Sequence, residues 1–437
     1  MRAEPDGGGR MRSSPPSPAP RRTAGRVGGV LGAAALAGAM ALGVAAPAHA
    51  DVVRDAEYWL DEYGIRAAWQ TTQGEGVTIA IIDTGVDPNV RELRGAVLEG
   101  ADFSGLGDPL GWAPVGGESG EHGTLVATMA AGRGSGPGSG VIGVAPGAKI
   151  LPISIGFGGE RDSDVQIAEA VRFAVDHGAD VINMSLTRNT LEWPVSWDEA
   201  FLYAAAHDVV IVAAAGNRAA GTTVVGAPAT MPGVLTVAGV DRFGNASEDA
   251  SSQGITISVA APSEELVGVA PGGGYRQWSG TSGSAPLVAG VVALVRAAHP
   301  ELDVANVINR IVTTARDVGP AGQDAWYGYG LIDAKAAVSA IVPRVAANPM
   351  GDLAEWVRVY RPTESEPVPL PTPVVIVPEA PVIVATGARS PTGVLLPSIE
   401  LLRAQGPAAL TVTAFLAGLA GLGVWGWRGI SRARDRR

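Results

Sequence analysis

Four short apolar segments, separated by helical patterns, most limit how this chain can fold. Strands that are apolar throughout, rather than at alternate positions, are typical of a parallel sheet covered on both faces. The segments are rich in valine and isoleucine and span residues 77–82, 150–155, 181–184 and 209–215. Helices are expected over residues 162–178, 197–208, 284–298 and 304–315. This alternation predicts a three-layer α/β fold, with a mainly parallel sheet between two layers of helices.

The helix expected over residues 162–178 carries the clearest end signals. Asp162 or Ser163 can cap its N-terminus, and Gly178 can end it. Residues three or four apart lie on one face of a helix. The apolar stripe is therefore predicted to contain Val165, Ala168, Val171 and Val175.

The N-terminal segment has the pattern of an export signal. Arg21, Arg22 and Arg26 precede an apolar run over residues 27–44, and Ala48-His49-Ala50 forms a small-x-small cleavage site. These features predict a signal peptide over residues 1–50, with an uncleaved N-terminal anchor as the alternative.

Near the C-terminus, residues 407–427 contain no charged side chain. As a helix rising about 1.5 Å per residue, they reach ~31 Å, enough to cross a bilayer. Arginines then recur through residues 428–437 and predict a cytoplasmic tail. We expect a single-pass cell-membrane protein with its folded part outside the cytoplasm.

Between these ends, the composition divides the chain into three further parts. Residues 343–406 are rich in proline, which predicts a semi-rigid, extended linker. Residues 77–342 hold the strand and helix patterns and are expected to form the globular domain. Residues 51–76 precede this domain as a short extension.

Charge and cysteine content exclude several kinds of function. The formal net charge of −11 argues against a nucleic-acid partner, which would need a basic surface. The chain has no cysteine, so disulfides, thiolate metal sites and a cysteine nucleophile are excluded.

Four polar residues stand where an α/β protein places its reactive groups, at strand ends and helix starts. Asp83 ends the first apolar segment, and Asn217 follows the fourth. His122 opens a helix of small residues, and Ser282 lies in "SGTSGSAP" at the start of another. Each residue alone also has a structural explanation, as a helix cap or a turn residue.

Taken together, the four residues fit nucleophilic catalysis. A serine hydroxyl needs a nearby base to remove its proton, and His122 can be that base for Ser282. Asp83 would hold the imidazole in the right tautomer and stabilise its charged form. The Asn217 amide and the backbone N–H of Ser282 can donate hydrogen bonds to an oxyanion.

The motifs around these residues resemble those of the subtilisin-like serine peptidases (family S8). The matching stretches include "VTIAIIDTGVD", "HGTLVATMAAG", "DVINMSL", "VVIVAAAGN" and "SGTSGSAPLVAG", in the chain order Asp, His, Ser. The resemblance implies a catalytic triad of Asp83, His122 and Ser282, with Asn217 as the oxyanion donor. It also places an extended substrate along Ser185-Leu186-Thr187 and makes Ala214-Ala215-Gly216 the wall of the pocket for the residue before the scissile bond.

Four positions depart from the usual pattern of that family. Leu125 stands where a second histidine is common, and Glu121 replaces a glycine next to His122. The Glu121 carboxylate is expected either to perturb the histidine or to face water. Gly283 replaces a larger residue, which predicts an emptier site floor, and Thr187 replaces a glycine, which is expected to narrow the cleft.

The order of segments resembles the mycosins, membrane-anchored members of this family that are associated with actinobacterial type VII secretion. The resemblance implies a serine endopeptidase at the plasma membrane that processes exported protein or peptide substrates. One alternative is a structural subunit of a secretion membrane complex, because the extension may cover the cleft and Gly418 and Gly421 permit close helix packing. Another is a general degradative surface protease.

No cofactor is expected, and no metal site is assigned. Structural calcium stays open, because carboxylates lie in loops at Asp102, Asp108 and Glu118. These residues do not have the spacing of a calcium-binding motif, which favours solvated loop carboxylates.

Overall fold

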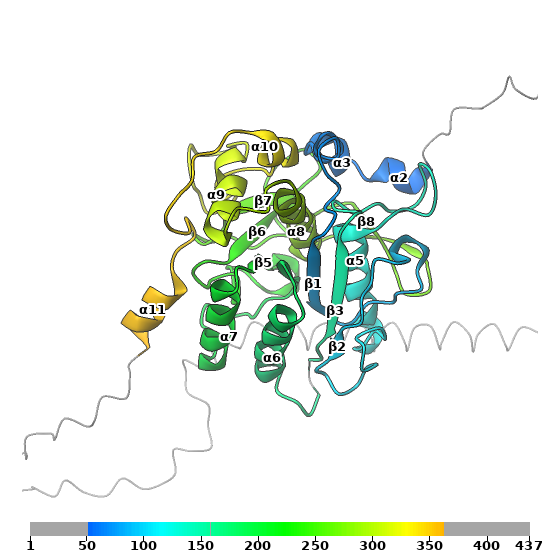
Figure 1. Ribbon diagram of the computed structural model, residues 1–437, viewed down its shortest axis with the longest axis horizontal. Coiled ribbons are helices and arrows are strands. Elements are labelled where there is room, and N and C mark those ends of the chain that lie inside the picture. The colour runs from blue at the N-terminus through cyan, green and yellow to red at the C-terminus, as the bar shows by residue number, and fades with distance from the viewer. Residues whose placement is uncertain (1–50, 158, 362–437) are drawn as a thin grey trace, which may run out of the picture. The chain divides into compact units, whose positions relative to one another are not determined.

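The computed structural model describes residues 51–157 and 159–361, and its core is a seven-stranded parallel sheet (Figure 1). The strand order is β2-β3-β1-β4-β5-β6-β7. The strands are β1 (Thr78–Asp83), β2 (Ala101–Asp102), β3 (Lys149–Ser154), β4 (Val181–Met184), β5 (Val210–Ala214), β6 (Leu235–Val240) and β7 (Val259–Pro262). A separate antiparallel hairpin pairs β8 (Leu266–Val269) with β9 (Tyr275–Trp278). The predicted mainly parallel sheet is confirmed.

Two pairs of long helices cover the sheet and make the three layers (Figure 1). One pair is α5 (His122–Ala131) and α8 (Thr281–Ala298), and the other is α6 (Ser163–Asp176) and α7 (Val195–Ala206). The remaining helices are α2 (Val52–Ala56), α3 (Trp59–Glu62), α4 (Ile65–Ala68), α9 (Val304–Thr314), α10 (Ala334–Ser339) and α11 (Leu353–Tyr360). Short 3₁₀ turns cover Arg91–Leu93, Gly117–Glu121 and Arg218–Ala220.

Several predicted segments lie outside the described residues. These are the signal peptide (1–50), most of the linker (362–406), the membrane span (407–427) and the tail (428–437). Among the described helices, only α8 is long and apolar enough to cross a membrane, and 83% of it is buried inside the fold. Helix α8 is therefore the core helix of the domain.

Helix α6 begins and ends where the sequence predicts, but its buried face differs from the predicted one. Asp162 caps it by accepting the N–H of Asp164 at 2.8 Å, and Gly178 follows its end with a φ of +74°. The predicted stripe is partly wrong, because Val165 is 44% exposed. The buried side is instead made by Gln166, Ile167, Ala170, Val171 and Ala174. Gln166 is buried because its amide exchanges hydrogen bonds with the backbone of Gly156 at 2.8 and 3.1 Å.

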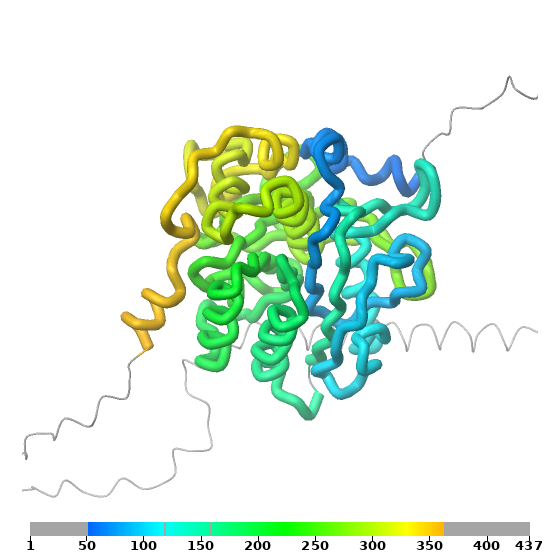
Figure 2. The backbone as a smooth tube through the Cα atoms, viewed as in Figure 1, coloured from blue at the N-terminus to red at the C-terminus, as the bar shows by residue number. Residues whose placement is uncertain are grey.

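The N-terminal extension is built into the domain rather than laid across its cleft. Trp59 and Leu60 are 1% and 0% exposed and belong to the hydrophobic core. Figure 2 shows this segment, in blue, beside the chain around α10, in yellow, where the N–H of Ala334 donates to the Tyr63 carbonyl at 2.9 Å. None of residues 51–76 lines the cleft that contains His122. The expectation that the extension may cover the cleft is thus not supported.

A buried contact between Arg54 and Glu57 fastens the start of this extension. Arg54 donates to the carbonyls of Gly140 and Ser139, both at 3.0 Å, and lies 3.0 Å from the Glu57 carboxylate. Glu57 also accepts the N–H of Ile142 at 2.9 Å. Burial raises the pKa of Glu57 to about 8, although Arg54 and the Ile142 N–H oppose this rise. Glu57 therefore takes up a proton more readily than an exposed glutamate does, which lowers the cost of burying it.

The structure differs from the expected linker over residues 343–361, because α11 forms there. Asp352 caps α11 by accepting the N–H of Ala354 at 2.8 Å, and no proline occurs between residues 350 and 361. The Trp356 ring packs on Trp193 with centroids 4.4 Å apart. Arg361 donates to the buried Asp198 carboxylate at 2.7 Å. This contact holds α11 against α7.

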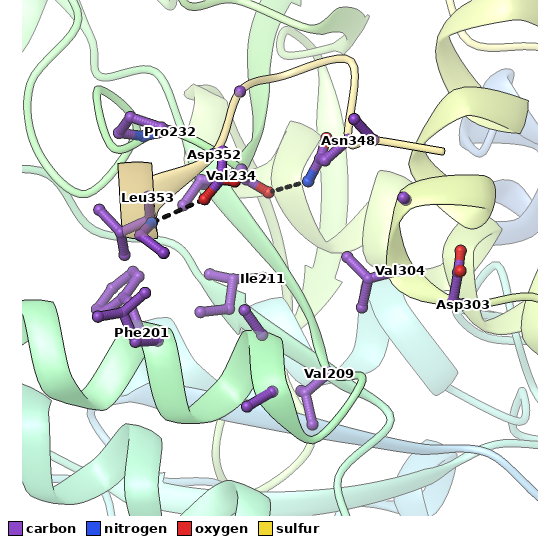
Figure 3. Close-up of a pocket in the computed structure, with 18 of the residues that line it drawn as sticks. Phe201, Val209, Ile211, Pro232, Val234, Asp303, Val304, Asn348, Asp352 and Leu353 are labelled. Atoms are coloured by element: carbon purple, nitrogen blue, oxygen red, sulfur yellow. Dashed lines mark hydrogen bonds between the residues drawn. The ribbon is translucent and has the colours of Figure 1, made fainter. Parts of the chain in front are cut away.

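The chain just before α11 crosses a mostly apolar cavity of about 640 Å³ (Figure 3). Phe201, Ile211, Val234 and Leu353 contribute apolar side chains to it. Asn348 holds the crossing chain in place by donating to the Gly233 carbonyl at 3.1 Å. This cavity shares no lining residue with the cleft around His122.

Replacing Leu60 by alanine tests whether the extension is part of the core. Leu60→Ala is expected to lower the free energy of unfolding by about 3 kcal/mol, because it leaves a cavity in a fully buried site. Val52→Ala is the control, since Val52 is 86% exposed, and it should change this free energy by less than about 0.5 kcal/mol. Urea unfolding of the two variants measures the difference. Equal effects would show that the extension does not contribute to the core.

Candidate active site

Asp83 and His122 form a hydrogen-bonded pair at the carboxyl end of β1. The Nδ1 atom of His122 lies 2.8 Å from Asp83 Oδ1 and 2.9 Å from Oδ2. Asp83 is the last residue of β1, and His122 is the first residue of α5. The N–H of Thr84 also donates to Asp83 Oδ1, at 2.7 Å. The carboxylate thus fixes the ring orientation and leaves the other ring nitrogen, Nε2, for chemistry.

The environment of His122 favours its charged form. Burial opposes protonation, but the charge of Asp83 and the hydrogen bond to it outweigh burial and raise the pKa of His122. The side chain of Asp83 is only 3% exposed, whereas that of His122 is 29% exposed. The histidine can therefore reach a substrate while its partner is shielded from water.

Thr84 supports this pair from behind, a role that the sequence analysis missed. Its hydroxyl donates to the Gly120 carbonyl at 2.9 Å and accepts the N–H of Gly123 at 2.9 Å. These bonds tie the end of β1 to the residues on both sides of His122. Thr84 lies within the stretch "VTIAIIDTGVD", but a bond to a segment that distant in the chain is not visible in the sequence.

The Glu121 side chain pairs with Arg276 and not with His122. Its carboxylate pairs with Arg276 Nε at 3.2 Å, and both side chains are more than a third exposed. The charge of Glu121 is not among the causes of the shifted pKa of His122. Of the two expectations for Glu121, the exposed position is the one that the structure supports.

Ser282 lies in the first turn of α8 and contacts the segment after β4. Its Oγ donates to the Ser185 carbonyl at 3.2 Å, and the Ser185 hydroxyl donates to the Ser282 carbonyl at 2.8 Å. The second bond is possible because Pro286, four residues on, has no N–H to occupy that carbonyl. Among the described residues, no hydrogen bond joins Ser282 Oγ to His122. Serine–base hydrogen bonds are often long before substrate binds.

Asn217 is held so that its amide donors stay available. The Asn217 Oδ1 atom accepts the N–H of Thr281 at 2.8 Å and lies 3.0 Å from the Thr281 hydroxyl. No acceptor for the Asn217 amide N–H groups occurs in the described part of the chain. Thr281 therefore orients Asn217 as a donor, a second supporting role that was not predicted.

The predicted substrate edge is open. In the described structure, no backbone hydrogen bond involves the N–H or C=O of Leu186 or Thr187. Such a free edge can accept an extended peptide as an added strand. Both residues line the cleft with His122 and Ser185.

The predicted pocket wall Ala214-Ala215-Gly216 is buried at the end of β5. Gly216 has a φ of +102°, and a Cβ there would lie 2.6 Å from Thr222 Cγ2. Only glycine fits this position, because both the backbone conformation and the space exclude a side chain.

The prediction of an emptier site floor at Gly283 is wrong. A Cβ at Gly283 would lie 2.2 Å from Leu266 Cδ1 and 3.4 Å from the Trp278 indole. The Trp278 ring also meets the His122 ring edge to face, with centroids 5.7 Å apart. Leu266 and Trp278 therefore fill this space from the β8–β9 hairpin. Leu125 lines the same cleft.

Two of the three loop carboxylates, Asp102 and Asp108, have structural partners, and the side chain of Glu118 lies outside the described part of the structure. Asp102 accepts the N–H groups of Ser104 and Gly107, both at 3.0 Å, and Asp108 accepts the N–H of Leu110 at 2.8 Å. Among the side chains that the structure describes, which exclude that of Glu118, no group of three or more His, Asp or Glu is placed to bind a metal ion.

Comparisons with known proteins agree with this geometry. The sequence profile of the subtilase family (peptidase S8) matches residues 74–330. Fervidolysin of Fervidobacterium pennivorans is 34% identical over 66% of this chain and 44% of its own length. Subtilisin E of Bacillus subtilis is 34% identical over 60% of this chain and 66% of its own length. The chain spans between 44% and 65% of the first three curated relatives that it matches.

Solved structures with the same fold include two secretion-associated proteases. MycP1 from the ESX-1 type VII secretion system has 30% identity and a TM-score of 0.57 over 67% of this chain and 88% of its own. The MycP3 protease from the ESX-3 system has 30% identity and a TM-score of 0.55 over 65% of this chain and 88% of its own. The cleft is lined by Asp83, His122 and Ser185, and Ser282 is hydrogen-bonded to Ser185 at its edge. With a family profile that covers more than half of its length, this chain belongs to the subtilase family of serine peptidases.

Proposed function

We propose that this protein is a membrane-anchored serine endopeptidase that cleaves exported proteins outside the cytoplasm. The observation that carries the proposal is the Asp83–His122 pair in a cleft whose lining residue Ser185 is hydrogen-bonded to Ser282. Thr281 orients the nearby Asn217 amide as a donor. Asp83, His122 and Ser282 are the proposed triad. The substrate edge is Ser185-Leu186-Thr187, next to the pocket wall Ala214-Ala215-Gly216.

In the first half of the reaction, a peptide binds along the free edge of Leu186 and Thr187. Ser282 Oγ turns from the Ser185 carbonyl to His122 Nε2, which takes its proton as the oxygen attacks the peptide carbonyl carbon. The carbonyl oxygen becomes an oxyanion that accepts hydrogen bonds from the Asn217 amide and the Ser282 backbone N–H. Asp83 stabilises the imidazolium ion that forms.

In the second half, the imidazolium gives its proton to the leaving nitrogen, and the C–N bond breaks. The acyl group stays on Ser282 as an ester. A water molecule then attacks this ester with His122 again as the base, and the carboxylic acid product leaves as Ser282 regains its proton. No metal or cofactor takes part in these steps.

The cellular role is proposed from similarity and from the ends of the sequence. The signal-like pattern over residues 1–50 and the apolar stretch over residues 407–427 support a cell-membrane location with residues 428–437 in the cytoplasm. Similarity to MycP1 and MycP3 supports a role in type VII secretion, with exported proteins as substrates and the secretion membrane complex as a partner. The two alternative roles make different predictions. A structural subunit would support export without cutting, whereas a general surface protease would cut unrelated surface proteins.

Profiling of secreted proteins and their new N-termini distinguishes these roles. Cells that lack the protein are compared with cells restored by the native chain or by Ser282→Ala. We expect only the native chain to restore the cut sites, because Ser282→Ala removes the nucleophile and lowers turnover by on the order of a million-fold, as measured for subtilisin. Restored export without cutting would indicate a structural subunit, and cut sites on unrelated surface proteins would indicate general degradation.

Substitutions at the oxyanion site are expected to lower kcat to different extents. Asn217→Ala is expected to lower kcat by about a hundred- to a thousand-fold, the range measured for such a donor in subtilisin. Thr281→Val should cause a smaller loss, because the Thr281 N–H still holds Asn217 at 2.8 Å. Steady-state kinetics on one peptide measures both, with the exposed Asn245→Ala as a control that keeps native kcat. A Thr281→Val loss as large as that of Asn217→Ala would contradict this arrangement.

The pH dependence tests the Asp83–His122 pair. His122 must be neutral to act as a base, so kcat/KM should fall as the pH drops through its raised pKa. Asp83→Asn removes the charge that raises this pKa, so the acidic limb should move to lower pH while kcat falls by about ten-thousand-fold. Profiles of kcat/KM against pH for both proteins show the shift. An unmoved acidic limb would mean that Asp83 does not set the pKa of His122.

A further inference from the structure

We place the side chain of the residue before the scissile bond between two segments that hydrogen bonds join. The first wall is residues 185–190, which follow β4, and the second wall is residues 222–227, beyond Ala214-Ala215-Gly216. Ser282 Oγ contacts the Ser185 carbonyl, and Asn217 directly follows Gly216. A peptide carbonyl placed at Ser282, with its oxygen toward Asn217, therefore directs that side chain between these walls. The inference below rests on the proposed function.

Hydrogen bonds join the two walls to each other. The N–H of Arg188 donates to the Ala227 carbonyl at 2.8 Å, and the N–H of Ala227 donates to the Thr190 carbonyl at 2.9 Å. The Thr222 hydroxyl also bonds to the Asn189 side chain. These links are backbone pairs and a buried hydroxyl, so the walls cannot separate without losing several hydrogen bonds.

At Gly226 the walls come into direct contact. A Cβ added to Gly226 would lie 1.7 Å from the Arg188 carbonyl oxygen and 2.8 Å from Thr187 Oγ1. Only glycine permits this approach. The Thr187 side chain thus points across the gap to the second wall. A glycine in place of Thr187 would leave this gap open. Its hydroxyl is held there by a 3.1 Å bond to the Arg188 carbonyl.

We propose that Thr187, with the Arg188–Gly226 contact behind it, closes this pocket, so that the enzyme cleaves after small residues such as alanine and serine. A phenylalanine or leucine side chain at this position would have to displace Thr187 or separate the hydrogen-bonded walls. Thr187 is a specificity residue in this scheme and takes no part in proton transfer. A shape mismatch of even one methylene group changes kcat/KM by about 10–200-fold, so the discrimination should be easily measured.

Peptides that differ only at this residue test the proposal on the purified full chain. The native enzyme should have kcat/KM for alanine at least about a hundred-fold above that for phenylalanine. Thr187→Gly should raise kcat/KM for phenylalanine by about ten-fold or more, because it reopens the space above Gly226. Thr187→Val is the matched control, since it keeps the branched shape without the hydroxyl, and it should keep the native preference.

The native profile also decides the matter if Thr187→Gly does not fold. Cleavage after phenylalanine or leucine as efficient as after alanine, and abolished by Ser282→Ala, would overturn the closed pocket and leave the peptidase function intact. An unchanged preference in folded Thr187→Gly would overturn the role of Thr187. A native enzyme with no Ser282-dependent cleavage of any peptide would overturn the proposed function, and this inference with it.

Discussion

The parallel order of β1, β4 and β5 is the constraint on which the active site depends. These three strands are neighbours in the sheet, so their carboxyl ends share one edge. Asp83 ends β1, Ser185 follows β4 and Gly216-Asn217 closely follow β5. Parallel sheets bring residues that are distant in the sequence to such an edge. The helices that cover one face, α5 and α8, then bring His122 and Ser282 to the same place.

Backbone groups and small hydroxyl side chains position most of the reactive groups. The Thr84 hydroxyl bonds to the segment before His122, and the Thr281 N–H orients the Asn217 side chain. The Ser185 hydroxyl donates to the Ser282 carbonyl, which has no helical partner because of Pro286. Each of these bonds satisfies a polar group that would otherwise be costly to bury. The site is therefore preorganised mainly by short side chains and main-chain atoms, which have little conformational freedom to lose.

Local signals predicted four strands of the sheet, β1, β3, β4 and β5, but not β2, β6, β7 or the β8–β9 hairpin. Among the elements that were predicted, long-range packing explains the errors. The cap at Asp162 and the stop at Gly178 are properties of a few adjacent residues, and the structure has both. The stripe of α6 was misplaced because Gln166 is buried by bonds to Gly156, which periodicity does not reveal. The site floor at Gly283 was misjudged because Leu266 and Trp278 reach it from another part of the chain.

The C-terminal helix was missed for a different reason. The prolines that predict a linker lie on both sides of α11 and obscure the capped, proline-free segment between them.

That helix gives the domain a defined mechanical attachment point. A pulling force on the chain beyond residue 361 enters the fold through Arg361 and its partner Asp198 on α7. The neighbour of Asp198, Trp197, packs under the guanidinium of Arg188 at 5.6 Å from ring centroid to Cζ. Arg188 supplies the carbonyl that meets Gly226 at the substrate pocket. A force applied at Arg361 would thus reach the surface that a substrate must fit through two side-chain contacts.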